Sequence, residues 1–444
     1  MASKIQTLPG FRDFPPQACA LRNYLFRKWR AAAIAHGFQE YDGPVLESLE
    51  LFTEKSGPEI VSQLFNFTDK GGREVSLRPE LTPTLARMVG ANAGSLKRPI
   101  KWFSIGECFR FEKQQKGRKR SFYQFNADIM GEEGPGADAE LISLCIQSMR
   151  SFGLEAEHFV LRLSDRTLWM TFLAELGLDE EASIRALSIV DKMERVDPDY
   201  TKQQLVAILG DSAGKFLDEV AAMRAVTTID ELDAWVSALG RDALVARMAQ
   251  WRELWGILDA MGLADFCRVD LGIVRGLAYY TGFVFEVFER NGEGRALAGG
   301  GRYDKLVEKL GYAPLHATGF AAGDVTMADI LESKGLLPSL LPALDCYVVY
   351  GSGEAERAAA MRAVATLRSL GISVDYPVKP TGFGKMFKQA DNSGARLALI
   401  FGGEEVAEGK FKMRDMATGG EAAGPLCDLV DGVKMRLAHG IEKA

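Results

Sequence analysis

A segment containing glycine and proline, residues 332–343, divides the sequence into two parts with different patterns. Gly335, Pro338 and Pro342 interrupt any helix or strand there, so the segment is predicted to be a linker. Residues 1–331 combine strands, turns and a long helical stretch, whereas the part after the linker alternates between strand and helix. A chain of 444 residues is also too long for one ordinary core. We therefore expect two domains joined by this linker.

The second part, residues 344–444, has the pattern of an α/β domain. Runs rich in aliphatic and aromatic residues predict three strands, and the stretches between them predict helices. The strands are expected at 346–350, 373–376 and 397–401, and the helices at 354–370 and around 384–392. Strands that alternate with helices in this way form a parallel sheet.

The first part begins with a pattern typical of a long helix. The helix is expected to open at Pro15-Pro16 and to end at Gly37, since proline favours the first helical turn and glycine the position after the last. Residues 38–47 then predict a strand that Pro44 interrupts. Because proline cannot donate to a strand ladder, we expect an edge or interface strand there.

An antiparallel pair of strands is predicted at 102–111 and 122–128, on either side of a polar loop at 113–120. Residues 166–262 are rich in alanine, leucine and acidic residues at helical spacing, and predict a helical insertion. Strand patterns return after the insertion. The fold class expected for the first part is therefore α+β, built on an antiparallel sheet.

Composition places the chain among globular proteins, with 47% hydrophobic and 25% charged residues. It has no run of about 18 apolar residues that would predict a membrane span, and its N-terminal residues lack the apolar core of a secretory signal. The six cysteines are scattered, which predicts reduced thiols in a cytoplasmic protein and no zinc site. The four histidines are isolated, so no metal site or nucleophilic triad is predicted. A net charge of −7 excludes a wholly basic coat for nucleic acid and leaves room for local basic patches.

The loop at 113–120 carries five cations in eight residues of an acidic protein. Most short charge runs are solvated hairpin tips. Here, however, the flanking strands bring Arg110, Glu112, Gln124 and Asp128 onto a floor that should be half buried. Desolvating such groups is unfavourable unless they bind something. We therefore predict a polyanion at the loop and a polar ligand on the floor.

Two further stretches place polar residues beside glycine. Residues 275–280 read Arg-Gly-Leu-Ala-Tyr-Tyr, and Gly299, Gly300 and Gly301 directly precede Arg302. Consecutive glycines leave a strand without side chains, so a ligand can lie on its backbone. This pattern favours a binding site over a flexible loop.

Together these blocks resemble the class II aminoacyl-tRNA synthetases, and specifically the histidyl-tRNA synthetase family, over nearly the whole chain. Residues 38–47 resemble motif 1, the dimer-interface strand of the class, and residues 109–128 resemble motif 2. The run at 275–280 resembles the motif specific to the histidine family and is the most specific match. Residues 344–440 resemble the α/β anticodon-binding domain that several class II synthetases share.

The resemblance implies a reaction in two steps. ATP and histidine form histidyl-adenylate and pyrophosphate, and the acyl group then passes to the 3′ end of tRNA(His). Both steps need positioning and charge neutralisation more than acid–base groups, which agrees with the isolated histidines. The implied partners are L-histidine, ATP with its Mg²⁺, tRNA(His) and a second copy of the chain, with no dedicated metal site on the protein.

The resemblance also implies roles for individual residues. Arg110 would hold the α-phosphate, Arg275 would stabilise charge opposite it as the carboxylate attacks, and Phe122 would stack on adenine. The residues implied to bind ATP are Arg110, Glu112, Arg118, Phe122, Gly300 and Arg302. The loop residues implied to contact the acceptor stem of the tRNA are Lys113, Gln115 and Lys116.

The histidine pocket implied by the resemblance has two parts. Glu80, Thr82 and Gln124 would hold the α-ammonium group, while Asp128 and Tyr280 would bracket the imidazole. The full set implied to bind histidine is Glu80, Thr82, Gln124, Asp128, Tyr279 and Tyr280. A site built on paired hydrogen bonds can reject ligands that lack the partner by about 10⁴–10⁵, which would make proofreading unnecessary.

Three positions depart from the pattern of the family. The helix after the glycine-rich strand normally carries an arginine that contacts the γ-phosphate of ATP, and Thr326 stands in its place. Ala278 replaces a common aspartate, and Asp128 a common glutamate. Arg118, Arg120 or Mg²⁺ are candidates to neutralise the γ-phosphate instead.

Two other functions fit parts of the pattern. A paralogue that acts as a histidine-sensing regulatory subunit of ATP phosphoribosyltransferase would keep the catalytic fold without charging tRNA. Such paralogues usually lack the C-terminal domain, which this chain has. A pure RNA-binding module would not explain an intact amino-acid pocket. The histidine ligase is therefore the favoured hypothesis.

Overall fold

The computed structural model describes residues 5–53, 61–112, 117–191, 193, 196–274, 279–290, 292, 294–340, 344–379 and 381–439. The chain forms two compact units, Met1–Leu340 and Leu341–Ala444. The structure differs from the prediction in the first half of the expected linker, where helix α13 (Asp324–Ser333) continues into it. Three leucines beyond that helix pack against the core of the first unit, namely Leu336, Leu337 and Leu340. Their burial outweighs the local effect of glycine and proline.

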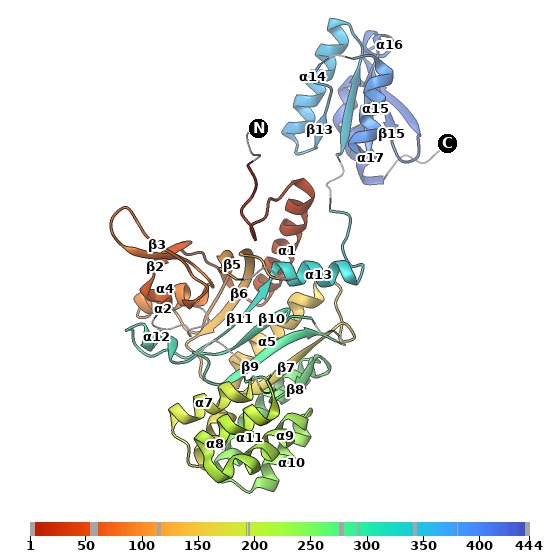
Figure 1. The fold of residues 1–444 in the computed structure, drawn as a ribbon. Coiled ribbons are helices and arrows are strands. Elements are labelled where there is room, and N and C mark those ends of the chain that lie inside the picture. The colour runs from red at the N-terminus through yellow and green to blue at the C-terminus, as the bar shows by residue number, and fades with distance from the viewer. Residues whose placement is uncertain are drawn as a thin grey trace. The chain divides into compact units, whose positions relative to one another are not determined.

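In the described residues, the first unit is built on an eight-stranded sheet in the order β1-β5-β6-β11-β10-β9-β7-β8 (Figure 1). The strands are β1 (Gln39–Glu40), β5 (Ile100–Phe109), β6 (Ser121–Met130), β7 (Phe159–Asp165), β8 (Cys267–Val269), β9 (Phe283–Glu289), β10 (Ala298–Arg302) and β11 (Ala317–Gly323). Neighbours are antiparallel except for the short outer pairs β1–β5 and β7–β8. This sheet confirms the expected antiparallel architecture and the predicted pairing of β5 with β6.

A second, three-stranded sheet lies beside the first. It consists of β2 (Leu46–Ser48), β4 (Glu74–Leu77) and β3 (Phe65–Thr68). The single strand predicted at 38–47 is thus two strands in two sheets, β1 and β2. The chain changes sheet at Gly43-Pro44, where the Arg78 guanidinium donates to the Gly43 carbonyl oxygen at 2.8 Å.

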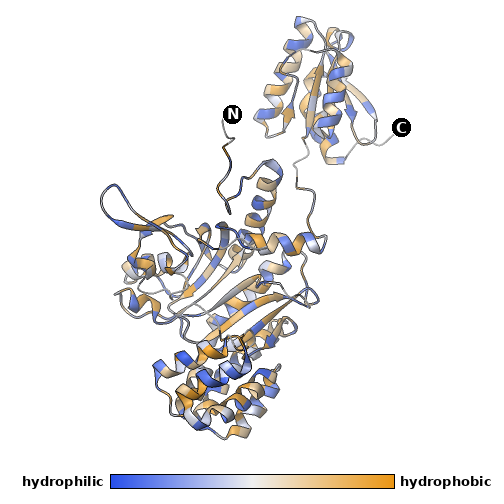
Figure 2. Ribbon diagram, in the orientation of Figure 1, coloured by the Kyte–Doolittle hydropathy of each residue, from blue (hydrophilic) through white to orange (hydrophobic). Residues whose placement is uncertain are grey.

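Helices cover the sheets of the first unit. They are α1 (Pro16–Ala35), α2 (Glu50–Thr53), α4 (Thr82–Asn92), α5 (Pro135–Arg150), α12 (Leu306–Lys309) and α13. Helix α1 begins at the predicted prolines and packs on the large sheet, where the rings of Trp29 and Phe125 stack with centroids 5.6 Å apart. In Figure 2 the central strands are mostly apolar, whereas the surface helices alternate between apolar and polar residues.

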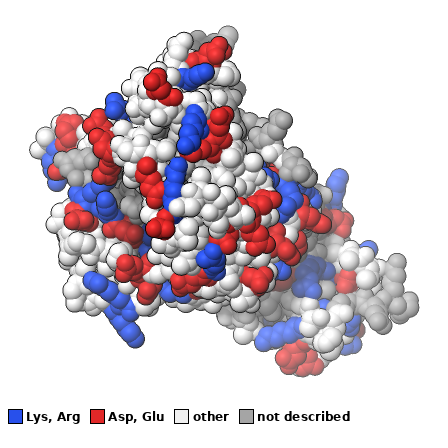
Figure 3. All heavy atoms as spheres, turned by 90° about the horizontal axis from the view of Figure 1, so that it is seen from below, with Lys and Arg blue, Asp and Glu red and all other residues white. Residues whose placement is uncertain are grey.

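The predicted helical insertion is confirmed. Its helices are α6 (Arg166–Glu175), α7 (Glu180–Val190), α8 (Pro198–Leu209), α9 (Ala213–Ala225), α10 (Ile229–Leu239) and α11 (Asp242–Ala260), with short 3₁₀ turns η1 (Gly210–Ser212) and η2 (Ala264–Phe266). Figure 3 views the molecule from this end and shows acidic and basic side chains interspersed over the face. This face therefore presents no patch of a single sign.

A buried carboxylate joins the insertion to the large sheet. Asp165, at the end of β7, caps helix α6 by accepting from the Thr167 backbone N–H at 2.9 Å. It also accepts from Arg247 Nε at 2.7 Å and from Trp251 Nε1 at 2.9 Å, both on α11. Four donors on one fully buried carboxylate fix the first and last helices of the insertion to the strand.

The second unit holds a five-stranded sheet in the order β13-β12-β14-β15-β16. Its elements are β12 (Cys346–Tyr350), α14 (Glu354–Ser369), β13 (Val374–Asp375), α15 (Phe383–Ser393), β14 (Leu397–Phe401), α16 (Gly403–Ala407), β15 (Lys410–Asp415), β16 (Glu421–Pro425), η3 (Leu426–Asp428) and α17 (Leu429–His439). The three predicted parallel strands are present. The antiparallel strands β15 and β16 were not predicted, because β16 has little apolar alternation and depends on its neighbour for pairing.

None of the helices in the described ranges is both long enough and apolar enough to cross a membrane.

Replacing Arg247 with alanine is predicted to destabilise the protein by about 3 kcal/mol or more, because it leaves the buried Asp165 carboxylate without its charged partner. The Arg252→Ala variant is a matched control on the same helix, since Arg252 forms an exposed ion pair with Asp233 and should change stability by less than about 1 kcal/mol. Urea unfolding followed by circular dichroism measures both. Equal losses in the two variants would contradict the anchoring role of Asp165.

Candidate active site

Strand β6 carries the polar floor predicted from the sequence. Alternate residues of a strand face the same side, so Phe122, Gln124, Asn126 and Asp128 share one face of the sheet. The neighbouring strand β11 places only small residues opposite the last three of them, in the register Gln124–Gly323, Asn126–Ala321 and Asp128–Gly319. The polar side chains therefore stand beside open space.

That space is a cavity of about 340 Å³. Its walls come from segments far apart in the chain: the loop before α4 and the first residue of that helix, the β5–β6 hairpin, Tyr279 and Tyr280, strands β9, β10 and β11, the segment leading into β10, and the start of α13. The predicted residues that line it are Glu80, Thr82, Arg110, Glu112, Arg118, Phe122, Gln124, Tyr279, Tyr280 and Gly300. The structure thus brings ten of the predicted residues to one cavity.

Gly319 leaves room for the deepest acid of the floor. A Cβ added at Gly319 would lie 1.9 Å from Asp128 Oδ1, closer than any side chain could tolerate. The Asp128 carboxylate therefore occupies the volume of the missing side chain. This is a physical reason for glycine at this place in the strand.

Asp128 is buried, and its carboxylate has no cationic partner among the described residues. Tyr303 donates its hydroxyl to Asp128 Oδ1 at 2.6 Å. Burial raises the pKa of Asp128 to about 7; the Tyr303 hydrogen bond lowers it and the nearby Glu80 carboxylate raises it further. Asp128 can therefore change its charge near neutral pH.

Glu80 is the second buried acid. Tyr279 donates to Glu80 Oε2 at 2.8 Å. Burial raises the pKa of Glu80, while the positive charge of Arg110 and the Tyr279 hydrogen bond lower it. The tyrosine and the arginine thus partly offset the unfavourable burial of the carboxylate.

Three buried acceptor atoms at or next to this end of the cavity have no hydrogen-bond partner in the described parts of the chain: Glu80 Oε1, Asn126 Oδ1 and Asp128 Oδ2. Glu80 and Asn126 line the cavity, whereas Asp128 does not and instead contacts the lining residues Gly319 and Tyr303. A buried acceptor without a donor is unfavourable by about 1–3 kcal/mol. All three would be satisfied by a ligand that brings N–H donors, best of all a positively charged one. This end of the cavity is therefore built for a cationic, donor-rich ligand.

The hairpin end of the cavity has the opposite character. Arg110 donates from Nε to the Pro79 carbonyl oxygen at 3.0 Å, and its guanidinium lies 5.3 Å from the centre of the Phe122 ring. Arg118 pairs with Glu112 at 3.0 Å. An arginine held beside a half-buried aromatic ring that lines the cavity suits a ligand with an anionic group next to a flat base.

Asp324, at the start of α13, holds three segments together beside the cavity. It pairs with Arg12 at 2.7 Å and accepts from the Tyr123 backbone N–H at 2.9 Å. The N-terminal segment also bonds directly to the hairpin, where Gly10 accepts from the Arg120 backbone N–H at 2.9 Å. These bonds fix the base of the hairpin to α13.

Four predicted residues lie outside the described residues: Arg275, Lys113, Gln115 and Lys116. Of the histidine-specific run, Tyr279 and Tyr280 are described and line the cavity. The predicted convergence of Arg110 and Arg275 on one nucleotide accordingly stays a prediction.

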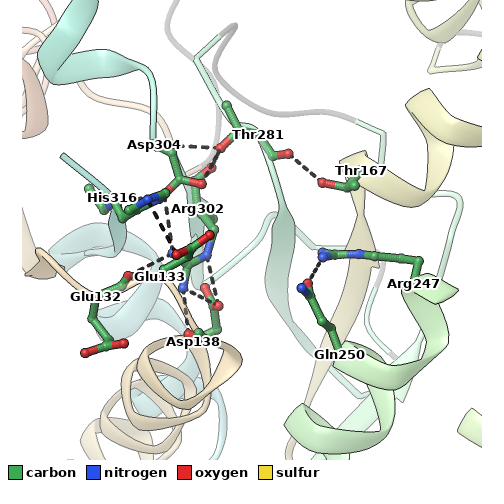
Figure 4. Close-up of polar contacts among 12 residues, drawn as sticks. Glu132, Glu133, Asp138, Thr167, Arg247, Gln250, Thr281, Arg302, Asp304 and His316 are labelled. Atoms are coloured by element: carbon green, nitrogen blue, oxygen red, sulfur yellow. Dashed lines mark hydrogen bonds and ion pairs between the residues drawn. The ribbon is translucent and has the colours of Figure 1, made fainter. Parts of the chain in front are cut away.

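Arg302 differs from its expected role. It does not line the cavity; it is buried against the start of α5, where it donates to Asp138 Oδ2 at 2.6 Å and to the Glu132 and Gly134 carbonyl oxygens (Figure 4). Asp304 lies 3.3 Å from the same guanidinium. Arg302 thus ties β10 to α5, and we do not carry it into the nucleotide site.

Several cavity residues were missed by the sequence prediction. They are Asn126, Glu286, Arg295 and Tyr303. Asn126 and Tyr303 could have been found, since Asn126 is two residues from both Gln124 and Asp128 on one strand and Tyr303 follows the glycine strand directly. Glu286 and Arg295 had no local signal, because their position depends on how β9 and β10 pair.

No group of three or more histidine, cysteine, aspartate or glutamate side chains in the described ranges could hold a metal ion. Asp324 is engaged by Arg12, and Glu112 by Arg118.

Comparisons with known protein families agree with this fold and cavity. The family model for histidyl-tRNA synthetase matches residues 10–325, and the model for the anticodon binding domain matches residues 345–436. The chain is 54% identical to the histidine–tRNA ligase of Opitutus terrae over 93% of this chain and 94% of the relative. It is 39% identical to the histidine–tRNA ligase of Halobacterium salinarum, over 94% of this chain and 95% of the relative.

A solved structure has the same fold. The histidyl-tRNA synthetase from Nostoc sp. PCC 7120 superposes with a TM-score of 0.79 and 22% sequence identity, covering 98% of this chain and all of that one. Together the fold and the family matches place this chain among the class II aminoacyl-tRNA synthetases. Within that class, the chain belongs to the histidyl-tRNA synthetase family.

The Asp128→Asn variant is predicted to be more stable than the wild type at higher pH. Because the folded-state pKa of about 7 lies above the ordinary value of 3.8, the wild type loses stability as pH rises through that window, and asparagine does not. For a pKa shift of about three units, the free energy of unfolding of the variant should rise by up to about 4 kcal/mol relative to the wild type.

Urea unfolding at about pH 5 and about pH 8 covers about two units of this window, so the difference in stability between variant and wild type should grow by about 3 kcal/mol over that range. Asp329→Asn is the control, since Asp329 is exposed on α13 and should show no such trend. A stability difference between Asp128→Asn and wild type that is constant across this range would contradict the prediction.

Proposed function

We propose that this cavity activates histidine with ATP and transfers it to tRNA(His), the reaction of a histidine–tRNA ligase. Membership of the family supports this activity. The observation in the cavity that carries the proposal is the contrast between its two ends. Unpaired buried acceptors form one end, and Arg110 beside Phe122 forms the other.

The acidic end is proposed to bind histidine. Glu80 Oε1 and the floor residues Thr82 and Gln124 would accept from the α-ammonium group, which brings three N–H donors. Asp128, with Tyr280 close by, would face the imidazole, whose ring nitrogens can both donate. An imidazolium would also compensate the Asp128 charge, so binding of histidine and ionisation of this acid favour each other.

The hairpin end is proposed to bind ATP. Adenine would stack on Phe122, Arg110 would hold the α-phosphate, and Glu112 with Arg118 would contact the nucleotide. Gly300 has no side chain, so the ligand can approach the β10 backbone. Mg²⁺ would arrive bound to the phosphates of ATP. Arg275 is proposed to stabilise the charge that develops as the carboxylate attacks.

The tRNA is proposed to contact both units. The basic loop at 113–120 would meet the acceptor stem, with Lys113, Gln115 and Lys116 in contact, and each phosphate contact there adds salt-dependent affinity. The second unit matches the anticodon binding domain. It would bind the anticodon, whose splayed bases offer edges for hydrogen bonding.

The alternative function, a regulatory subunit of ATP phosphoribosyltransferase, is not better supported. The chain contains the anticodon-binding domain, and its cavity combines buried acceptor atoms with Arg110 beside Phe122, which we propose as separate histidine and nucleotide ends. A regulatory subunit needs only the first of these ends. The two functions differ in a single measurable property, the formation of histidyl-adenylate.

The wild-type protein is predicted to exchange labelled pyrophosphate into ATP only when histidine is present. Arg110→Ala should lower the exchange rate about 10²–10³-fold, because it removes a positioned charge next to the reacting phosphate. The control Arg362→Ala changes an exposed arginine in the second unit and should leave exchange unchanged. Absence of exchange by folded wild-type protein with magnesium present would favour the regulatory function.

We also propose a homodimer. The small sheet exposes apolar side chains, with Leu46 at 41% and Phe67 at 48% exposure. Leu46 and Ser48 are two residues apart on β2 and face the same side. Ser48 pairs with Val75 and Val75 with Phe67, so Leu46 and Phe67 lie on one face of the sheet. Exposed apolar side chains grouped on one sheet face are typical of an interface.

The wild type is therefore expected to sediment at twice the chain mass of 48.6 kDa. A variant with Leu46→Glu and Phe67→Glu should sediment as a monomer, because the interface would then bury two charges. Ile184→Glu, at an equally exposed position on α7, should remain dimeric. A wild-type monomer at micromolar concentration would refute the dimer.

A cytoplasmic location is part of the same proposal. All six cysteines are free thiols in the structure, and three of them are buried. Free buried thiols are typical of proteins from a reducing compartment.

A further inference from the structure

The segment that leads into β10 brings an arginine to the cavity. Arg295 lines the cavity and comes three residues before β10. Its position is set by a backbone bond between neighbouring strands, in which the Gly323 N–H donates to the Leu297 carbonyl oxygen at 3.4 Å. Gly323 is the last residue before α13. The segment with Arg295 is therefore held beside the first turn of this helix.

Arg295 and Thr326 meet the hairpin loop at the same glycine. Arg295 donates from Nη1 to the Gly117 carbonyl oxygen at 3.4 Å. A Cβ built on Gly117 would lie 3.5 Å from Arg295 Cδ and 3.9 Å from Thr326 Cγ2. The side chains of Arg295 and Thr326 therefore flank the same glycine of the loop and are neighbours. Arg295 thus places a positive charge next to Thr326, which has none.

The other arginines of the cavity have defined positions on the hairpin. Arg110 lies deeper, against Phe122 and the Pro79 carbonyl oxygen, and Arg118 is paired with Glu112. Arg295 is exposed and reaches the loop from the β10 side. A nucleotide whose α-phosphate lies at Arg110 would extend its remaining phosphates outward. Those phosphates carry most of the negative charge of ATP and would need a cation at the outer part of the cavity.

We propose that Arg295 binds the β- and γ-phosphates of ATP and supplies the positive charge that Thr326 lacks. The proposal rests on the proposed function, since it takes ATP as the ligand. A guanidinium suits this role because it makes paired, charge-assisted hydrogen bonds to phosphate oxygens.

The test compares two nucleotides. Titration calorimetry with ATP and with AMP, both with magnesium, gives their dissociation constants for the wild type and Arg295→Ala. The variant is expected to bind ATP about tenfold to a hundredfold more weakly, as for the loss of charge-assisted hydrogen bonds, while AMP binding stays unchanged. Arg185→Ala, which removes an exposed arginine from α7, should change neither constant.

Two outcomes would overturn the assignment. Unchanged ATP binding in Arg295→Ala means that this residue does not contact the distal phosphates, and equal weakening of ATP and AMP means that it acts elsewhere on the nucleotide. Thermal unfolding confirms that the variant folds, and Arg295→Gln provides a second variant of similar length. Nucleotide binding is measured without turnover. If the wild type binds ATP but shows no histidine-dependent exchange, the proposed ligase activity fails, while the role of Arg295 in ATP binding can still be tested.

A second arginine position tests the geometry. In the Arg295→Ala background, Thr326→Arg is expected to restore most of the lost ATP affinity, because the two side chains are neighbours at Gly117. It should leave AMP binding unchanged. ATP affinity that stays at the level of the single variant would mean that the two positions serve different parts of the cavity, and would overturn the proposal.

Discussion

The burial of two carboxylates, one on strand β6 and one in the loop before α4, is the constraint on which the rest of the cavity depends. Glu80 and Asp128 are removed from water, and each accepts from a tyrosine hydroxyl; the charge of Arg110 also favours ionised Glu80, whereas no described cation pairs with Asp128. The unfavourable free energy of removing these carboxylates from water is therefore already offset when the free protein folds, and ligand binding does not have to supply it. A ligand that brings positive charge and N–H donors then gains the interactions that the protein lacks. Electrostatic preorganisation of this kind is a main source of specificity and rate in enzymes.

The same constraint accounts for the glycines of the neighbouring strands. Gly319 leaves the volume that Asp128 fills. On β10, a Cβ at Gly300 or Gly301 would lie within 2.6 Å of a backbone oxygen of the adjacent strand. The strands can pair tightly beside the acids only because these side chains are absent. Glycine here thus serves close packing of the sheet as well as access to its backbone.

Ion pairs and hydrogen bonds at and beyond the cavity hold its walls in place. Asp324 joins the N-terminal segment, β6 and α13, while Arg302 joins β10 to α5 (Figure 4). Asp165 fixes the helical insertion to β7. Because each of these bonds links segments that are distant in sequence, the cavity walls keep their positions without a ligand. A site of this kind can act by positioning, which is what adenylate formation and acyl transfer require.

The sequence by itself determined the elements whose signals are local: the long first helix, the hairpin with its basic loop, the glycine strand, the helical insertion and the second α/β unit. Strand alternation also brought Phe122, Gln124 and Asp128 to one face, and the motif resemblance selected ten of the residues that line the cavity. Only the tertiary structure decided that Arg302 turns to Asp138, that Tyr303 holds Asp128, and that Arg295 lies beside Thr326. These facts depend on strand register and on contacts between residues more than a hundred positions apart, or at one glycine shared by three segments. Local patterns of hydrophobicity and charge give no information about strand register or about these contacts.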